Sequence, residues 1–291
     1  MVLTDVLVGG LTLGGLYALT ALGLTVQYGV ARILNLAYGQ FLIAAAFGAF
    51  VLATRFGLSP IITLFLALPV GFALQWTVYQ LLLMPLVRRT GAGPALETDS
   101  ILLTFGLSFL VLGICVAAFG GDLYSYSYLA YPVDILGSKV SANRLVAMVF
   151  AFAMTAVLYL LLTRTRLGTA VRAVAVSPRF APLVGIDVRA ASAIAFGIGG
   201  ALLAASGVLI SMFLPFSASL GVVFAMKALI VVIMGGAGNL MGCLVAGLLL
   251  GFVETLVASY VDPGLTVAAN FTLFLLVLLL RPTGLFGKAV R

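Results

Sequence analysis

The amino-acid sequence predicts an all-α fold, a polytopic transmembrane helix bundle of about eight or nine spans. Of the 291 residues, 64% are hydrophobic and 8% are charged, whereas about a quarter of an ordinary soluble domain is charged. A spanning helix uses about 20 apolar residues, so eight or nine spans would use about 160 to 180. The apolar runs are continuous rather than alternating, which excludes a β-barrel. We therefore expect a single transmembrane domain over residues 1–291.

The composition also excludes several kinds of site. The sequence contains no histidine, so we expect no histidine-based metal site, no Ser-His catalysis and no histidine proton relay. Cys115 and Cys243 lie inside apolar runs and are expected to be buried and unpaired. The net charge of +7 comes from basic residues spread over short loops, which fits membrane topology better than a nucleic-acid surface. We expect no catalytic residue, metal, cofactor or nucleic-acid partner.

The first half of the chain supplies five long apolar runs. Met1–Asp5 has no basic residue, so we expect the first run to remain as a span rather than to be cleaved as a signal peptide. Gly10, Gly14 and Ala18 form a stripe of small residues on this run, which is typical of close helix contact. The predicted spans are 5–30, 36–54, 61–84, 101–120 and 145–162.

Four further runs follow a more polar segment. The run 222–235 is short, which predicts either a tilted span or half of a broken helix. Small residues recur four apart at Gly238 and Gly242, and again at Gly247 and Gly251, which indicates more helix contacts. The predicted spans are 190–213, 222–235, 239–260 and 265–280.

Basic residues set the predicted orientation. The segment 163–189 is rich in arginine, so it should be cytoplasmic. With the predicted number of spans, the basic residues of 85–100 and of the C-terminus fall on the same side, and 121–144 becomes a periplasmic loop. We expect the tyrosines of that loop to lie at the membrane interface, or the loop to dock a partner. The residues behind this assignment are Arg88, Arg89, Arg281, Lys288 and Arg291 on the inside, and Tyr124, Tyr126, Tyr128 and Tyr131 on the outside.

The cytoplasmic segment 163–189 has the start and stop signals of a short helix at about 178–184. Ser177 is a suitable N-cap, Pro178 suits the first helical position, and Gly185 suits the residue just past the end. One face of this helix would be apolar, and it would either rest on lipid headgroups or insert into a groove of a cytosolic partner. The predicted docking residues are Arg172, Arg179, Phe180, Leu183, Val184, Gly185 and Asp187.

Four separated segments of the sequence carry a recognisable pattern: 15–37, 165–188, 235–242 and 281–287. In this order they resemble the permease subunits of branched-chain amino acid ABC importers. The resemblance covers essentially the whole chain, and the length is similar to that of the smaller of the two homologous permeases in such transporters.

The resemblance implies a partner list and a power source. The partners would be a second homologous permease, two cytosolic ATP-binding subunits and a periplasmic solute-binding protein. The function would be ATP-driven uptake of branched-chain amino acids or related small polar solutes, such as amides and urea, by a multi-pass protein in contact with lipid in the bacterial inner membrane. The chain itself lacks a P-loop, because 282–289 has neither the first Gly nor the final Ser or Thr. ATP hydrolysis is therefore expected on other subunits, and this chain is not expected to be an enzyme.

Polar residues within the spans are candidates for the translocation path. The candidates are Asn35, Tyr38, Gln40, Lys227, Asn239 and Glu254. Asn35, Tyr38 and Gln40 either break the helix and expose backbone to a cavity or form an ordinary cytoplasmic turn. Lys227 is expected to snorkel toward the outer surface. Glu254 would pair with Lys227 or face the path.

The sequence departs from the family pattern at several of these positions. Tyr38 and Gln40 stand where the family usually has a histidine and an acid, Asn239 replaces a usual serine, and Thr169 replaces a common basic residue. Because Tyr38 and Gln40 lie near the expected path, their identity bears on the exact substrate rather than on the transporter class.

Three other classes of membrane protein fit the sequence less well than a permease. An ion-coupled secondary transporter normally needs buried acids or histidine, and only Glu254 qualifies here. An intramembrane enzyme would need a metal site of the His-Glu-x-x-His kind or paired aspartates, and neither occurs within the predicted spans. A channel would need rings of charge or a carbonyl filter motif, which the sequence lacks.

Overall fold

The computed structural model describes residues 2–90, 94–135 and 138–287, and within them it confirms the helical bundle. Nine helices in the described residues are long and apolar enough to cross a membrane, and they match the nine predicted spans. Their bounds are α1 Val2–Ala31, α2 Tyr38–Phe56, α3 Pro60–Val78, α5 Pro94–Phe119, α6 Ala142–Arg164, α8 Val188–Ser211, α9 Gly221–Gly235, α10 Leu240–Tyr260 and α11 Thr266–Leu280.

Shorter elements complete the chain. A π-helical turn at Tyr79–Leu83 joins α3 to α4 (Met84–Thr90), so this span continues further than predicted. The strands β1 (Pro132–Ile135) and β2 (Ser138–Ser141) pair antiparallel. The remaining elements are α7 (Arg166–Val176) and the 3₁₀ turns Ala181–Val184, Ala218–Leu220 and Pro263–Leu265.

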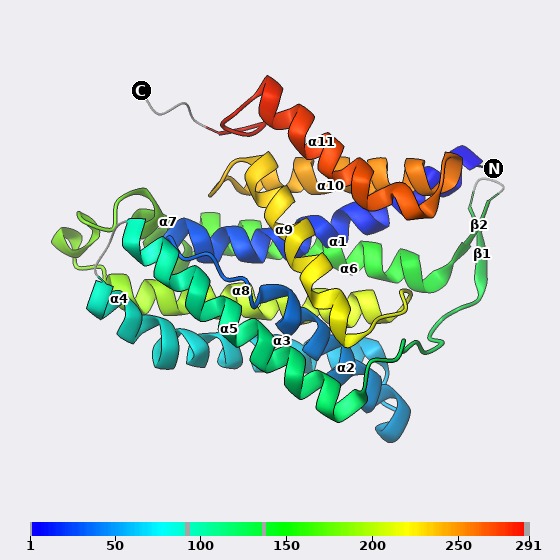
Figure 1. The fold of residues 1–291 in the computed structure, drawn as a ribbon, viewed down its shortest axis with the longest axis horizontal. Helices are drawn as coiled ribbons and strands as arrows, with labels where there is room; N and C mark the ends of the chain where they lie inside the picture. The colour runs from blue at the N-terminus through cyan, green and yellow to red at the C-terminus, as the bar shows by residue number, and fades with distance from the viewer. Residues whose placement is uncertain (1, 91–93, 136–137, 288–291) are drawn as a thin grey trace.

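The two ends of the bundle carry different elements. Figure 1 shows α4 and α7 at one end, and the N-terminus with the β1–β2 hairpin at the other. Basic residues are not confined to one end, because Lys139 and Arg144 lie beside Asp5 at the hairpin end. Arg88 and Arg89 end α4, and the arginine-rich segment 163–189 contains α7. Lys288 and Arg291 lie outside the described residues, so the C-terminal part of the assignment rests on Arg281 alone.

The helices α1 and α8 form the centre of the bundle. Almost every residue of α8 from Ala191 to Ser211 is buried, and the interior of α1 is buried as well. Helix α1 packs along α10, α8, α6 and α9. The outer helices α3, α5, α6 and α11 expose large apolar side chains, as expected for surfaces that face lipid or another membrane subunit.

Small residues allow α1 and α10 to pack at backbone distance, as the predicted stripes indicate. A Cβ added to Gly14 would lie 2.8 Å from the Leu248 Cα, and one added to Gly251 would collide with the backbone of Gly14. Ala18 faces Gly247 in the same way. Without a hydrophobic force between helices in lipid, such close van der Waals contact stabilises the pair.

The loop between α5 and the β1–β2 hairpin is fixed by aromatic packing and by hydrogen bonds. Tyr124 and Phe216 exchange two backbone hydrogen bonds of 2.8 and 2.9 Å, and Phe47 stacks on Phe119 beside them at 4.2 Å between ring centroids. Tyr126 shares a hydrogen bond with Ser211. Burial raises the pKa of Tyr126 above its usual value, although the hydrogen bond with Ser211 opposes this shift. The Tyr126 hydroxyl therefore stays protonated at physiological pH.

We predict that Gly251→Ala destabilises the protein by about 1–3 kcal/mol, because the new methyl group would force α1 and α10 apart. The measurement is thermal unfolding of the purified protein in detergent. Gly106→Ala on α5 is the matched control, since a Cβ there meets nothing within 4 Å. Equal melting temperatures for the two variants would contradict the packing role of Gly251.

Candidate functional site

The chain leaves helical geometry between α1 and α2, where the sequence predicts a break. Residues 32–35 are irregular and Leu36 and Ala37 form a turn, and the connection runs back from the end of α1 toward the middle of the bundle (Figure 1). Thr104 of α5 supplies hydrogen bonds to backbone groups that have no helical partner here. Its hydroxyl donates to the Leu34 carbonyl and accepts from the Leu36 amide, each at 3.1 Å. Irregular backbone at membrane depth needs such partners.

Asn35 lies within this break and joins three helices through a cluster of buried amides. Its side-chain amide donates to the oxygens of Gln27 on α1 and Gln75 on α3, each at 3.4 Å. Gln27 in turn donates to the Phe196 carbonyl of α8. Gln75 therefore bonds between helices, as interhelical polar residues are expected to do. Among the described residues, the Asn35 oxygen and the Gln75 nitrogen have no partner.

Tyr38 and Gln40 begin α2 deep inside the bundle. The Tyr38 hydroxyl donates to the carbonyl of Gly199, midway along α8, at 3.1 Å, and it occupies the space that a side chain on Gly23 would need. Gln40 is 1% exposed, and neither atom of its amide group has a hydrogen-bond partner within the described part of the chain. A buried amide without hydrogen bonds lowers the stability of the folded protein by about 1–3 kcal/mol. Most buried polar side chains are therefore hydrogen-bonded, and Gln40 is an exception.

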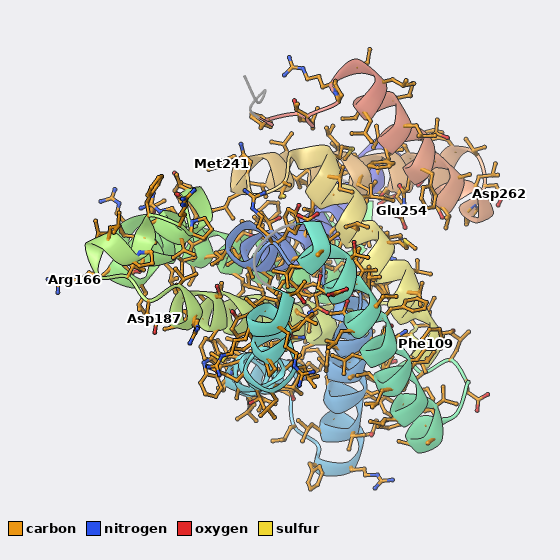
Figure 2. All side chains as sticks on the ribbon, turned by 60° about the vertical axis from the view of Figure 1, so that its left-hand side comes forward. Phe109, Arg166, Asp187, Met241, Glu254 and Asp262 are labelled. Atoms are coloured by element: carbon orange, nitrogen blue, oxygen red, sulfur yellow. The ribbon has the colours of Figure 1, made fainter. Side chains whose placement is uncertain are left out.

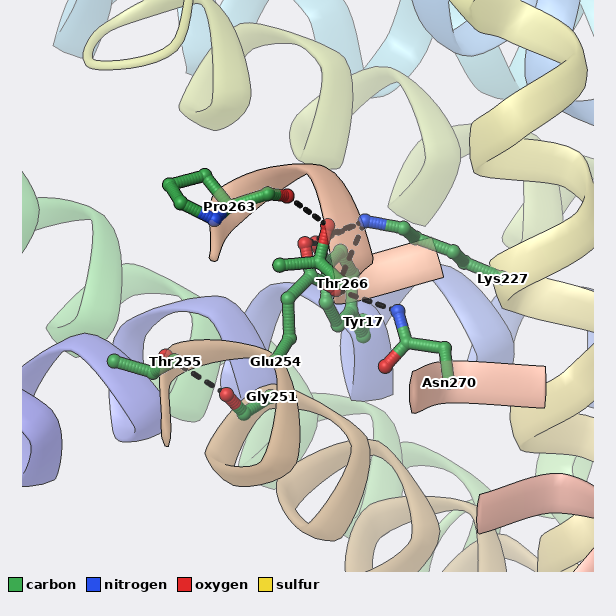
Figure 3. Close-up of polar contacts among 8 residues, drawn as sticks. All are labelled: Tyr17, Lys227, Gly251, Glu254, Thr255, Pro263, Thr266 and Asn270. Carbon is green, nitrogen blue, oxygen red and sulfur yellow. Dashed lines mark hydrogen bonds and ion pairs between the residues drawn. The ribbon is translucent and has the colours of Figure 1, made fainter. Parts of the chain in front are cut away.

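A second polar cluster lies elsewhere in the bundle and contains a buried ion pair. Lys227 on α9 donates to both carboxylate oxygens of Glu254 on α10, at 2.7 and 2.9 Å. Tyr17 on α1 accepts from Lys227 at 2.8 Å and donates to Glu254 at 3.0 Å. Asn270 on α11 donates to Glu254 at 2.8 Å. Figure 3 shows these side chains from four helices converging.

The predicted snorkelling of Lys227 is wrong. The side chains of Lys227 and Glu254 are 13% and 12% exposed, and the lysine is turned inward because a carboxylate and a phenol oxygen accept its hydrogen bonds. Of the two alternatives for Glu254, the structure has the pairing with Lys227. Asn270 is the one buried residue of α11, so the cluster also fastens the last helix to the bundle.

Asn239 is not close to either cluster. Its side chain caps α10 by accepting from the Gly242 amide at 3.0 Å, and it donates to the Phe286 carbonyl at 3.0 Å. Leu285 also donates to the Met234 carbonyl at 2.8 Å. Two segments with family-like patterns, 235–242 and 281–287, therefore pack on each other. The serine that Asn239 replaces is also a good N-cap.

The predicted docking residues gather at the end of the bundle that carries α4 and α7, near α7 and the following 3₁₀ turn. Phe180 is 63% exposed, Leu183 80% and Val184 73%. Phe180, Val184 and Arg172 border a groove of about 510 Å³, together with Val176, which was not predicted. Asp187 instead has a capping role. Its carboxylate accepts hydrogen bonds from the amides of Arg189 and Ala190 at the start of α8.

The predicted helix at 178–184 is wrong in its start and type. Ser177 ends α7 instead of capping a new helix, and only Ala181–Val184 is helical, as a 3₁₀ turn. Pro182 explains the difference, because proline has no N–H to bond to the carbonyl four residues earlier. The predicted stop is confirmed, since Gly185 has a φ of 77°, a conformation that glycine adopts without strain.

The sequence prediction missed several residues of these sites. Gln27, Thr104, Tyr17 and Asn270 all lie within predicted spans. Gln27, Tyr17 and Asn270 bond to side chains that were predicted, whereas Thr104 bonds to the backbone of Leu34 and Leu36. The signal was present, since a polar side chain inside a span is costly and is functional or structural by default. Figure 2 shows how Glu254 lies among helices far from Arg166 and Asp187.

We predict that Lys227→Met or Glu254→Gln alone destabilises the protein by about 3–5 kcal/mol, because each leaves an unpaired buried charge. The double variant should recover most of this loss, since no charge remains. Thermal unfolding of the four proteins forms a double-mutant cycle. Tyr17→Phe is the control for loss of the phenol hydrogen bonds and should cost only about 1 kcal/mol. Additive losses in the double variant would show that the two charges are independent.

Comparison with known proteins identifies the family. Residues 6–281 match the family described as "Branched-chain amino acid transport system / permease component". The permease LivH of Salmonella typhimurium is 27% identical, over 96% of this chain and 94% of its own. BraD of Pseudomonas aeruginosa is 29% identical over 97% and 95%, and a probable LivH of Methanocaldococcus jannaschii is 26% identical over 97% and 92%. No solved structure matches the chain.

These relatives are named as high-affinity or probable branched-chain amino acid transport permeases, which are transport proteins. The family match covers almost all of the chain, and the nine apolar helices among the described residues agree with it. The chain is therefore a multi-pass inner-membrane protein that belongs to the permease family of branched-chain amino acid ABC transport systems.

Proposed function

We propose that this chain forms one half of the translocation path of an ABC importer for branched-chain amino acids or related small polar solutes. The complete transporter would contain a second homologous permease, two cytosolic ATP-binding subunits and a periplasmic solute-binding protein. The names of the relatives support the substrate class, and the word "component" in the family description supports additional subunits. ATP hydrolysis falls to the partners, because the chain has no P-loop.

The observation that carries this proposal is the exposed apolar surface at the cytoplasmic end. Phe180, Leu183 and Val184 project there from a short turn, although basic residues surround them. A turn of this size needs tertiary support, which Ala181 provides because it is buried and its carbonyl accepts from the Ile186 amide. A rigid turn with protruding apolar side chains is suited to fit a groove of an ATP-binding subunit and to transmit its movement.

The proposed path runs past the break between α1 and α2. Its lining would include Asn35, Tyr38 and Gln40, whose polar atoms lie at the depth where a polar solute needs hydrogen-bond partners. The start of α2 packs on the start of α9 through glycines, since a Cβ on Gly39 would collide with the Gly221 carbonyl. Because Gln40 is unpaired in this state, movement between α2 and α9 would let its amide bond to the passing solute.

The secondary-transporter alternative loses its remaining support. Glu254 was the one acid suited to ion coupling, and it is neutralised by Lys227 at 2.7 Å. Proton-driven uptake by the purified chain alone would reopen that alternative.

We predict that Phe180→Asp abolishes ATP-driven uptake and releases the ATP-binding subunits. Burial of a phenylalanine side chain contributes about 1.5–3 kcal/mol to such a contact, and an aspartate there would lose its hydration. Co-purification of the subunits and substrate-stimulated hydrolysis in nanodiscs are the measurements.

The matched control is Phe286→Asp, which changes another exposed phenylalanine outside the segment 163–189. It should leave the ATP-binding subunits attached. If the Phe180→Asp complex stays intact and still hydrolyses ATP in response to loaded binding protein, the turn rests on lipid instead.

We predict that Gln40→Met lowers the uptake rate at least about tenfold while it leaves thermal stability equal or higher. Stability should not fall, because removal of an unpaired buried amide relieves a cost of about 1–3 kcal/mol. The two measurements together separate transport from folding. An unchanged uptake rate would remove Gln40 from the proposed path.

A further inference from the structure

A cavity of about 410 Å³ opens at the cytoplasmic end of the bundle, apart from the groove beside Phe180. It lies between the end of α1, the π-helical turn after α3, the start of α5 and the start of α8. Its volume falls in the range of about 300–1,000 Å³ that small-molecule sites occupy. The residues that matter here are Val30, Arg32, Val87, Leu96, Glu97 and Arg189.

The cavity combines charges of both signs with an apolar wall. Arg32 and Arg189 supply positive charge, and Glu97 supplies negative charge. Within the described residues the one ion pair is Lys227–Glu254, so these three side chains have no charged partner there. A few polar groups that converge on an apolar pocket are the usual form of a ligand site.

We propose that this cavity binds a zwitterionic aliphatic amino acid from the cytoplasm and thereby slows import. The carboxylate of the ligand would pair with Arg189 or Arg32, because guanidinium groups suit planar carboxylates. Its ammonium group would pair with Glu97, and its branched side chain would pack on Val30, Val87 and Leu96. The inference rests on the proposed function, since the ligand is then the product of transport.

The position of the cavity gives the ligand a way to act. Pro178 and Val188 of the cytoplasmic segment line one side of it, and Arg32 at the α1–α2 break lines another. A ligand that holds these parts together favours one arrangement of the segment relative to the bundle. Binding then shifts the population away from other arrangements that the transport cycle needs.

The experiment uses the complete transporter in proteoliposomes with ATP inside and loaded binding protein outside. The initial uptake rate is compared between vesicles with and without about 10 mM L-leucine in the lumen, well above a millimolar dissociation constant. We expect internal leucine to lower the rate several-fold. 4-Methylpentanoate and isoamylamine, which are leucine without its ammonium group and without its carboxylate, should inhibit much less. Equal inhibition by either analogue, or none by leucine, would overturn the proposal.

Substitutions of the charged residues that line the cavity test whether these residues bind the ligand. Glu97→Gln and Arg189→Gln should each raise the leucine concentration for half-inhibition about tenfold or more, because each removes a charge-assisted hydrogen bond. Arg88→Gln is the matched control, since Arg88 is exposed and outside the cavity, and it should be inhibited like the unaltered protein. Unchanged inhibition in both cavity variants would contradict the assignment.

A direct binding measurement separates this proposal from the proposed function. Equilibrium dialysis of labelled L-leucine against the permease–ATPase complex, without binding protein, should show saturable binding that Glu97→Gln weakens about tenfold. Failure of ATP-driven uptake in leucine-free vesicles would count against the proposed function alone. Absence of leucine binding to a complex that does transport would count against the cavity alone.

Discussion

The close packing of α1 against its neighbours is the constraint on which the rest of the structure depends. A 30-residue helix can be buried in the middle of a bundle only where adjacent helices approach to backbone contact, and the glycines of α1, α8 and α10 allow this. Helix α1 contributes one residue to the ion pair, one to the surroundings of Tyr38 and one to the Asn35 cluster. Tyr17 joins the ion pair, Gly23 makes room for Tyr38, and Gln27 bonds to Asn35. These positions span about 15 Å along the helix, so α1 sets the relative depth of all three.

The two buried polar clusters differ in how completely their hydrogen bonds are made. In the ion cluster, Lys227 and both oxygens of Glu254 are bonded, which suits a fixed joint between four helices. One atom of this cluster, the Asn270 oxygen, has no partner among the described residues. The residues around the α1–α2 break retain unpaired atoms on Asn35, Gln40 and Gln75. Since unpaired buried groups gain most from a new partner, the break is the part of the bundle best suited to interact with a solute.

The positions of the spans could be predicted from the sequence because long apolar runs are a direct consequence of the membrane as solvent. The docking of the glycine stripes was also predictable, since spacing of four places small residues on one helix face. Helix α7 was not predicted, because its sequence is moderately polar and the start and stop signals at Ser177, Pro178 and Gly185 lie after its last residue. The helix predicted at 178–184 includes Pro182, whose missing N–H favours the shorter 3₁₀ turn.

The site residues were harder to predict than the spans. Asn35, Tyr38 and Gln40 were found because they interrupt an apolar pattern. The partners Gln75 of Asn35 and Gly199 of Tyr38, however, come from distant parts of the chain. The pairing of Glu254 with Lys227 was one of two alternatives from the sequence, but helix position alone could not choose between this pairing and a snorkelling lysine. Pairing is a property of the assembled bundle.

The ion pair between α9 and α10 has a consequence for biogenesis. Each charge would cost about 2.5–3.5 kcal/mol if its helix entered the bilayer alone. The two helices are joined by only the four residues 236–239, so they can leave the translocon together as a hairpin with their charges already neutralised. Tyr17 is by then in the membrane, whereas Asn270 follows with the last helix. Because α11 is synthesised after α9 and α10, the hydrogen bonds of the cluster are complete only once α11 has inserted into the membrane.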